Sequence, residues 1–396
     1  TYTVVLLVED NYIPPDSDTD TCVITVSTES PIADPNGPYY INEGDGVNLD
    51  ASGSYDPDGI ITQWEWDLDN DGQYDDATGE NPYINWNNLK ALGIDDDGTY
   101  TIGLKVKDDD GAESTDTTTI VVSNIAPSVT APPDVSGNEG SSVTIGTTTF
   151  SDPGADTHTA SIDWGDGNVD NLGSVTGSIS PQSHTYNDDG IYTITITVTD
   201  DDLGTGSDTL TATINNVAPD ISGTPDQTGN EGSAITFVAG SVTDPGDDSF
   251  MYRWDWNNDG IYDTTWSSSP TKQYTWYDDY SGTVRVQVKD DEGDTDYDTC
   301  SVTVNNVAPS TPTDIVFIPS HVEVGDTLTA VASGSSDVPA DTITYYYKFY
   351  DVDLSSIIQD WSTDNDIVVQ LAQKNHVIRV YTRAVSYTHL TLPTKA

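Results

Sequence analysis

Two stretches of alternating aspartates have the residue types and spacing of a cation-binding loop. Calcium is a hard cation that takes several oxygen ligands, and alternate residues of a tight loop can supply them around a glycine. That glycine stands at the sixth position of both stretches, as Gly72 and Gly260. The candidate metal ligands are Asp67, Asp69, Asp71, Asp75, Asp255, Asn257, Asp259 and Asp263.

The twelfth position of each loop argues against one known type of calcium site. An EF-hand has a bidentate glutamate there, whereas these loops have Thr78 and Trp266. Another ligand would have to complete the coordination shell. Ordinary Asp-Gly turns in an acidic chain also produce this pattern. The sequence leaves both interpretations open, and Ca²⁺ is the one cofactor that it suggests.

Tryptophans at the second of these loops suggest a different chemistry. Trp256 lies inside the loop and Trp266 follows it, and an exposed indole can stack on a sugar face or on a neighbouring protein. The alternative is that both rings cover hydrophobic edges. Trp66 and Trp254 precede the loops at strand positions, so we expect them in the core.

The sequence contains no pattern typical of a catalytic centre. No serine elbow, zincin helix or phosphate-binding loop is found. The histidines share neither a repeat position nor a metal-type spacing; they are His158, His184, His321, His376 and His389. Carboxylate pairs are expected by chance in a chain with 67 acidic residues. We therefore expect no enzyme in this segment.

The charge of the chain is strongly one-sided. Lys and Arg total 12, and the formal net charge is -55. This field repels phosphate backbones and anionic headgroups, so we expect no nucleic-acid partner, and no apolar run is long enough for membrane insertion. Divalent cations or a saline, extracellular setting would relieve the self-repulsion. Solubility of a long repeat protein explains the same acidity.

The elements that must position these loops recur along the chain. Glu43, Glu139, Glu231 and Glu323 stand in equivalent motifs, at steps of 96, 92 and 92 residues. A period of that size is about one β-sandwich domain. The joints between segments are short and end in proline, at 124–127, 216–219 and 306–309. Short proline-containing joints favour a semi-rigid rod.

Apolar and polar residues alternate within each segment, which is typical of half-buried antiparallel strands. The clearest example is Tyr100, Ile102, Leu104 and Val106. An acidic turn with glycine follows, and then a second alternating strand, so a hairpin is predicted. The fold is predicted to be all-β. Cys22 and Cys300 occupy equivalent strand positions, and we expect both to be buried and unpaired.

Several motifs occur together in one order: the Glu-Gly pair at Glu43, SGSYDPDG at 52–59, the tryptophans before Asp67, DDDGTYTIGLKVKDDDG at 95–111 and IDWGDG at 162–167. The chain from Thr1 to about Asn306 resembles the polycystic kidney disease (PKD) domain, repeated in tandem. The resemblance implies antiparallel Ig-like β-sandwiches in an elongated array. It also implies spacer or interaction modules of surface proteins, or accessory modules of secreted hydrolases.

The repeats divide the chain into predicted domains. A C-terminal part of a truncated PKD-like repeat covers 1–28, and complete PKD-like repeats cover 29–124, 125–216 and 217–306. Residues 307–384 form a diverged Ig-like module. Residues 385–396 have no counterpart in any repeat and resemble a translated sequencing adapter, so they are excluded from the fold prediction and both ends are expected to be cut.

These observations predict a non-catalytic spacer or interaction array within a larger secreted or cell-surface protein, with calcium as its candidate stabiliser. Its expected partners are neighbouring domains of that protein and extracellular protein or polysaccharide. The alternative is a carbohydrate- or protein-binding accessory module of a secreted hydrolase.

Overall fold

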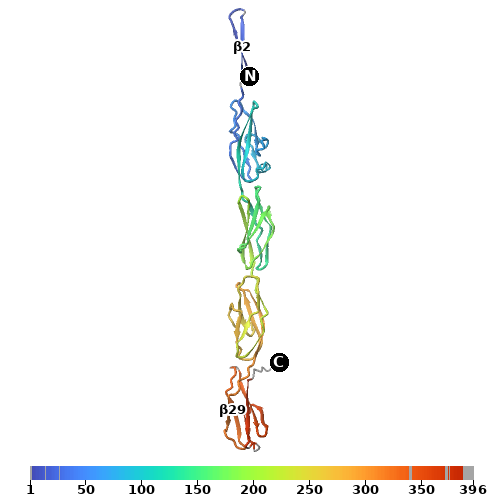
Figure 1. Ribbon diagram of the computed structural model, residues 1–396, viewed down its shortest axis with the longest axis vertical. Helices are drawn as coiled ribbons and strands as arrows, with labels where there is room; N and C mark the ends of the chain where they lie inside the picture. The colour runs from blue at the N-terminus through green and yellow to red at the C-terminus, as the bar shows by residue number, and fades with distance from the viewer. Residues whose placement is uncertain are drawn as a thin grey trace. The chain divides into compact units, whose positions relative to one another are not determined.

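The computed structural model describes residues 2–13, 15–25, 27–338, 341–370, 373 and 375–386. Most of the adapter-like tail predicted at 385–396 therefore lies outside the described residues. Strands make up nearly all the regular structure of the described part, and they recur in each successive coloured segment of Figure 1. The predicted all-β fold is confirmed.

The chain forms two compact units. Unit 1 comprises Thr1–Gly137, Ser142–Tyr186 and Gly190–Ile214, and unit 2 comprises Asn138–Ser141, Asn187–Asp189 and Asn215–Ala396. The second predicted repeat contributes residues to both units, whereas the first repeat lies entirely in unit 1. The predicted domain boundaries stay predictions.

The first repeat is a sandwich of a large sheet and a small one. The large sheet has the order β3 (Tyr39–Asn42), β9 (Glu113–Ser123), β8 (Gly98–Asp108), β5 (Ile61–Asp67) and β6 (Ala77–Thr78). The small sheet pairs β4 (Val47–Asn48) with β7 (Tyr83–Ile84). A short helix, α1 (Trp86–Ala91), follows β7, and the Asn85 side chain caps it by accepting from the Asn88 amide.

The second repeat has the same main sheet. Its strand order is β11 (Val135–Asn138), β19 (Thr205–Asn215), β18 (Gly190–Thr199), β14 (His158–Asp163) and β15 (Val169–Val175). A three-stranded sheet contains β10 (Ser128–Thr130), β13 (Thr148–Ser151) and β16 (Ser178–Ile179), and a two-stranded sheet contains β12 (Ser142–Ile145) and β17 (Gln182–Thr185).

The third repeat shortens the main sheet to four strands. Their order is β21 (Gln227–Asn230), β27 (Thr295–Asn305), β26 (Tyr280–Lys289) and β24 (Met251–Asp255). Two smaller sheets pair β20 (Asp220–Ser222) with β23 (Ser241–Thr243), and β22 (Ile235–Val238) with β25 (Thr271–Tyr274).

In the described residues of the fourth repeat, the strands form two three-stranded sheets. One contains β28 (Asp314–Ile318), β29 (Thr327–Ser333) and β32 (Asp366–Val368); the other contains β31 (Ser356–Ser362), β30 (Ile343–Asp351) and β33 (Ile378–Ser386). The strand β29 is labelled in Figure 1.

Four separate hydrophobic cores lie in these repeats. Each of the first three contains a tryptophan at or directly after the C-terminal end of the IDWGDG-type strand, and Trp66, Trp164 and Trp254 are all less than 2% exposed. The alternating strands supply the rest, because side chains at every second position of a strand face one side. The predicted core positions of Trp66 and Trp254 are confirmed.

The two cysteines have different environments, which corrects one prediction. Cys300 is buried in the third core and unpaired, as expected. Cys22 is exposed, because it belongs to the hairpin of β1 (Tyr2–Glu9) and β2 (Ser17–Ile24), in which every described residue is exposed. A strand pattern alone does not bury a side chain. Burial also needs a second layer packed against that face.

Candidate functional sites in the aspartate loops and at the repeat junctions

The first aspartate loop is organised around its innermost carboxylate. Asp67 ends β5 and is 2% exposed. Its Oδ1 accepts a hydrogen bond from the Asp71 amide at 3.1 Å, and its Oδ2 accepts one from the Gly72 amide at 2.9 Å. Asn70 and Gly72 have positive φ angles of 56° and 88°, which turn the loop back toward Asp67. Asp67 therefore holds the loop closed through its own backbone.

Asp69 and Asp71 complete an acidic group at this loop. Asp67, Asp69 and Asp71 each offer a carboxylate oxygen, and these three oxygens lie within 4.8 Å of one another. Partial desolvation and then the charges of nearby carboxylates raise the pKa of Asp69. Asp71 is engaged locally, since its Oδ1 accepts from the Gln73 amide at 2.7 Å. The loop thus gathers three of its four predicted ligands.

The fourth predicted ligand of this loop, Asp75, is exposed, and its neighbour Asp76 faces the loop instead. Asp76 Oδ2 accepts from the Leu68 amide at 2.7 Å and from the Asp69 amide at 3.2 Å. The reason is the return of the chain, because the Asp76 amide donates to the Trp66 carbonyl at 3.1 Å. The residue that the sequence spacing predicted, Asp75, is therefore not the one that faces this loop.

The second loop has the same anchor. Asp255 ends β24, is 0% exposed and accepts from the Gly260 amide at 2.9 Å. Asn257 donates from Nδ2 to Asp259 Oδ2 at 3.0 Å. Asp263 is exposed, but its Oδ2 accepts from the Trp256 amide at 2.8 Å, so in this loop the predicted residue is the one that closes the loop.

The tryptophan at the second loop is part of the core, which corrects its proposed stacking role. Trp256 is 5% exposed. Its ring stacks on Trp254, with centroids 5.5 Å apart, and on Tyr274, with centroids 4.8 Å apart. The indole is buried because the longer loop folds its second residue inward as a further core side chain.

Trp266 has a more open environment than Trp256. It is half-buried, and the Arg253 guanidinium lies 4.4 Å from its ring centroid. Lys289 Nζ lies 5.4 Å from the same ring. These cations stabilise the indole through cation–π contacts, and Trp266 is the one of the two predicted stacking residues with exposed surface.

A second acidic group lies where the first repeat meets the second inside unit 1. Glu43 follows β3 and is 4% exposed. Its amide donates to the Ser123 carbonyl at 3.1 Å, and its Oε2 accepts from the amide of Ile125, a residue of the joint, at 3.0 Å. Its Oε1 is buried and has no hydrogen-bond partner among the described residues.

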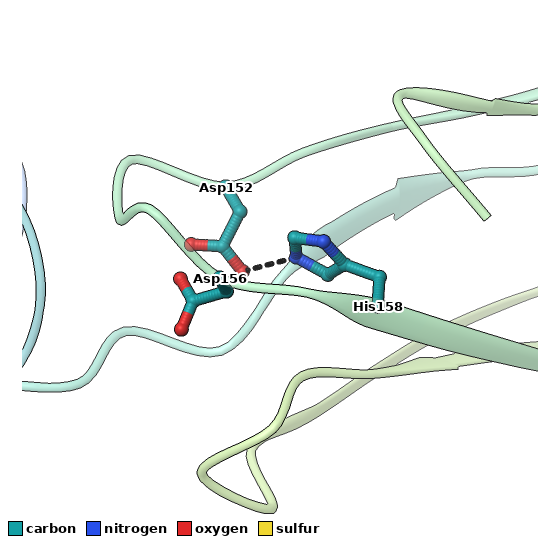
Figure 2. A group of neighbouring side chains, drawn as sticks. All are labelled: Asp152, Asp156 and His158. Atoms are coloured by element: carbon teal, nitrogen blue, oxygen red, sulfur yellow. Dashed lines mark hydrogen bonds and ion pairs between the residues drawn. The ribbon is translucent and has the colours of Figure 1, made fainter. Parts of the chain in front are cut away.

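Asp156 reaches this group from the next repeat. It lies between β13 and β14, and both of its carboxylate oxygens are buried without a hydrogen-bond partner in the described part of the chain. Burial, followed by the charges of Glu43 and Asp152, raises the pKa of Asp156 to about 7. Figure 2 shows Asp156 beside Asp152, whose Oδ2 lies 3.0 Å from His158 Nε2.

Asp96 closes the group from the first repeat. Glu43, Asp96 and Asp156 each offer a carboxylate oxygen, and these oxygens lie within 4.8 Å of one another. The two repeats also touch through α1, where Trp86 Nε1 donates to the Pro153 carbonyl at 3.1 Å. We name Glu43, Asp96 and Asp156 the junction cluster.

Unit 2 contains two equivalents of the junction-cluster glutamate. Glu139 is 0% exposed and Glu231 is 2% exposed. Each accepts from a joint amide at 2.6 Å, Val217 for Glu139 and Val307 for Glu231. In both glutamates Oε2 is buried and has no hydrogen-bond partner among the described residues.

Aspartates surround both of these glutamates. Burial is the main cause that raises the pKa of Glu139, and the charges of Asp244, Asp189 and Asp188 add to it. For Glu231, burial and then the charges of Asp341, Asp337 and Asp278 raise the pKa in the same way. Burial, with a hydrogen bond to Glu292 and the charge of Asp244, raises the pKa of Asp248 to about 8.

The sequence prediction missed these clusters although their signal was visible. The glutamates served only as markers of the repeat, with their steps of 96 and 92 residues. Asp156, Asp248 and Asp341 recur at steps of 92 and 93, and Asp96, Asp188 and Asp278 at 92 and 90. These aspartates recur at nearly the same steps as the glutamates, and this common period could have indicated that they form a site together.

Three of the described histidines, His158, His184 and His376, pair with aspartates. His184 Nε2 lies 2.6 Å from Asp166 Oδ2, and His376 Nδ1 lies 2.9 Å from Asp351 Oδ2. The imidazole of His376 contributes to a lowered pKa of Asp351 against the opposing effect of desolvation. No helix among the described residues is long and apolar enough to cross a membrane.

Comparison with known proteins identifies the first two complete repeats. The family model of the PKD domain matches residues 28–122 and 124–215. Among solved structures, the PKD domain of an M14-like peptidase from Thermoplasmatales archaeon SCGC AB-540-F20 is 28% identical, covering 23% of this chain and 98% of its own, with a TM-score of 0.20.

Two further structures are similar to the chain. The PKD1 domain of Vibrio anguillarum Epp is 28% identical over 24% of this chain and 96% of its own, with a TM-score of 0.19. Extracellular cadherin domains 1–5 of protocadherin gamma B2 are 15% identical over 97% of this chain and 85% of their own, with a TM-score of 0.31. The family assignment rests on the two sequence matches.

Proposed function

From the premise that residues 28–122 and 124–215 of this chain are tandem PKD domains, we propose that the chain is a non-catalytic spacer and interaction array. It belongs to a larger secreted or cell-surface protein, and its partners are the neighbouring domains of that protein. Residues 217–306 are a third PKD-like repeat and residues 307–384 a diverged Ig-like module.

The observation that supports this proposal is the way each joint is held by the repeat before it. The buried glutamates Glu43, Glu139 and Glu231 accept hydrogen bonds from the joint residues Ile125, Val217 and Val307. A buried charge-assisted hydrogen bond restricts the joint far more than a flexible linker would. Repeats with separate cores and restrained joints suit a spacer.

Calcium is part of this proposal. The aspartate loops at 67–76 and 255–263 present carboxylate oxygens at alternate positions, and three of them in the first loop lie within 4.8 Å of one another. Calcium bound there would offset the repulsion among these charges and stiffen the loops.

Small-angle X-ray scattering of the whole chain tests the spacer role. The expected result is an elongated particle whose maximum dimension stays constant over a dilution series in calcium. A collapsed or randomly coiled chain, both with calcium and with a chelator, would contradict the proposal. Sodium chloride at matched ionic strength separates calcium binding from charge screening.

A carbohydrate- or protein-binding accessory role is the second candidate, and the exposed surface of Trp266 favours it. Retention of the chain on insoluble polysaccharides should then be lost in Trp266→Ala. Tyr277→Ala, a change at another exposed aromatic residue of the same repeat, is the matched control. No retention of the unmodified chain on any polysaccharide or extracellular protein would remove this candidate.

A further inference from the structure

Three buried glutamates of this chain each have one satisfied and one unsatisfied carboxylate oxygen. In Glu43 the joint amide of Ile125 satisfies Oε2, while Oε1 is buried and has no partner among the described residues. Glu139 and Glu231 repeat this arrangement in unit 2. A buried acceptor without a partner is costly and rare in folded proteins, so its recurrence points to a missing ligand.

The unsatisfied oxygens converge with those of an aspartate. A Cβ atom added to Gly154 would lie 2.7 Å from Glu43 Oε1 and would also contact Asp156 Oδ2, so both oxygens lie close together beside this glycine. A Cβ atom added to Gly246 would likewise lie 2.7 Å from Glu139 Oε2 and would contact Asp248 Oδ2. Two carboxylate oxygens this close together repel each other unless a cation or a proton lies between them.

The chemistry of the junction cluster favours a hard divalent cation. Its three members offer only carboxylate oxygens, which calcium prefers. None of the ion pairs among the described residues uses Glu43, Asp96 or Asp156. His158 Nε2 lies 3.0 Å from Asp152 Oδ2, and a ring nitrogen of His158 and carboxylate oxygens of Asp152 and Asp156 lie within 4.8 Å of one another, so Asp156 also borders a neighbouring group that contains one nitrogen.

We propose that a calcium ion binds between Glu43, Asp96 and Asp156, at the junction of the first two repeats, and that an equivalent ion binds at Glu139 with Asp248. This inference goes beyond the spacer role and does not depend on it. One glutamate then links three parts of the chain, because Oε2 holds the joint while Oε1 and the aspartates hold the ion.

Calcium binding to the whole chain tests the proposal directly. Equilibrium dialysis is compared among the unmodified chain, Glu43→Gln and Asp156→Asn, with Glu80→Gln as the control. Glu80 is exposed, so its variant removes the same charge away from the cluster. Each cluster variant should weaken one site by at least about tenfold, and Glu80→Gln should leave every site unchanged. Unchanged binding in both cluster variants would overturn the proposal.

Thermal unfolding separates an ion site from a structural glutamate. With a chelator present, Glu43→Gln removes one of several repelling charges, so its melting temperature should equal or exceed that of the unmodified chain. With calcium in excess, the order should reverse, because the variant has lost a charged ligand. A variant that is equally destabilised in both conditions shows that Glu43 only holds the joint, which contradicts the proposal.

The aspartate loop supplies a further control. Asp71→Asn changes a carboxylate of the first loop and leaves the junction cluster intact. If calcium acts at the junction, Glu43→Gln should change the melting temperature in the same way when Asp71→Asn is also present. It should not lower the melting temperature in a chelator, and it should lower it in excess calcium. A reversal that disappears when Asp71 is changed would assign the calcium effect to the loop and would overturn the junction site.

Discussion

The aspartate loop at 67–76 and the junction cluster are both dense in carboxylates, but they differ in whether their carboxylate oxygens accept hydrogen bonds. In the loop, Asp67 and Asp76 accept hydrogen bonds from four backbone amides. In the junction cluster, Glu43 keeps one oxygen and Asp156 both oxygens buried and unpartnered in the described residues. The loop can therefore fold without a ligand. The buried carboxylates of the cluster destabilise the fold until a cation or a proton binds to them.

The number of acidic residues in a segment does not by itself identify a ligand site. The loops look richer in sequence, with aspartates at alternate positions around a glycine. The junction cluster is assembled from three distant segments and contains fewer acids in any one of them. Unsatisfied buried oxygens, and not the number of carboxylates, distinguish a ligand site from a self-contained turn.

The largest effect is expected from the core residue beneath the second loop. Trp256→Ala should destabilise the third repeat by about 3–5 kcal/mol, because it leaves a cavity between Trp254 and Tyr274. Trp266→Ala removes only cation–π contacts of a half-buried ring and should cost about 1 kcal/mol. Chemical denaturation of both variants checks the difference. Equal losses would mean that the loop does not rest on the core through Trp256.

The next effect is expected from the anchor of the first loop. Asp67→Ala removes the acceptor of the Asp71 and Gly72 amides, and the two lost charge-assisted bonds should cost about 3 kcal/mol even without calcium. Asp69→Ala, a change at an exposed position of the same loop, should cost much less. Urea unfolding in a chelator measures both. A large loss that appears only in calcium would show that the loop, like the junction cluster, depends on an ion.

Removal of calcium should have an effect of similar size. A ligand that binds only the native state stabilises it by about 2.7 kcal/mol at a hundredfold excess over its dissociation constant. Differential scanning calorimetry with calcium and with a chelator should therefore show a fall in melting temperature. The same fall after replacing calcium with sodium at matched ionic strength leaves calcium binding as the explanation, whereas full rescue by sodium reduces it to screening.

The smallest effect distinguishes two neighbouring aspartates. Asp76→Asn weakens the acceptor of the Leu68 amide and should cost about 1 kcal/mol. Asp75→Asn lies at an exposed position and should leave stability unchanged. Parallel thermal melts of the two variants check the register of the loop. A larger loss of stability for Asp75→Asn than for Asp76→Asn would mean that Asp75, as the sequence spacing predicted, is the residue that faces the loop.

The sequence by itself determined the repeat and the sandwich cores. The alternation through Tyr100, Ile102, Leu104 and Val106 places one face of β8 inside, and Ile102, Leu104 and Val106 are all 0% exposed. The step of 96 and 92 residues between Glu43, Glu139 and Glu231 gives the period of the domains. These properties are local or periodic, so a single strand or a simple count reveals them.

Tertiary structure alone decided which acids meet and which rings are covered. Asp76 replaced Asp75 because the first loop returns to Trp66 one residue later, and Trp256 is buried because Tyr274 of another strand covers its ring. Glu43 and Asp156 are more than a hundred residues apart in the chain, and only the packing of one repeat on the next brings them together. Contacts between distant segments depend on chain path and packing, which local patterns do not encode.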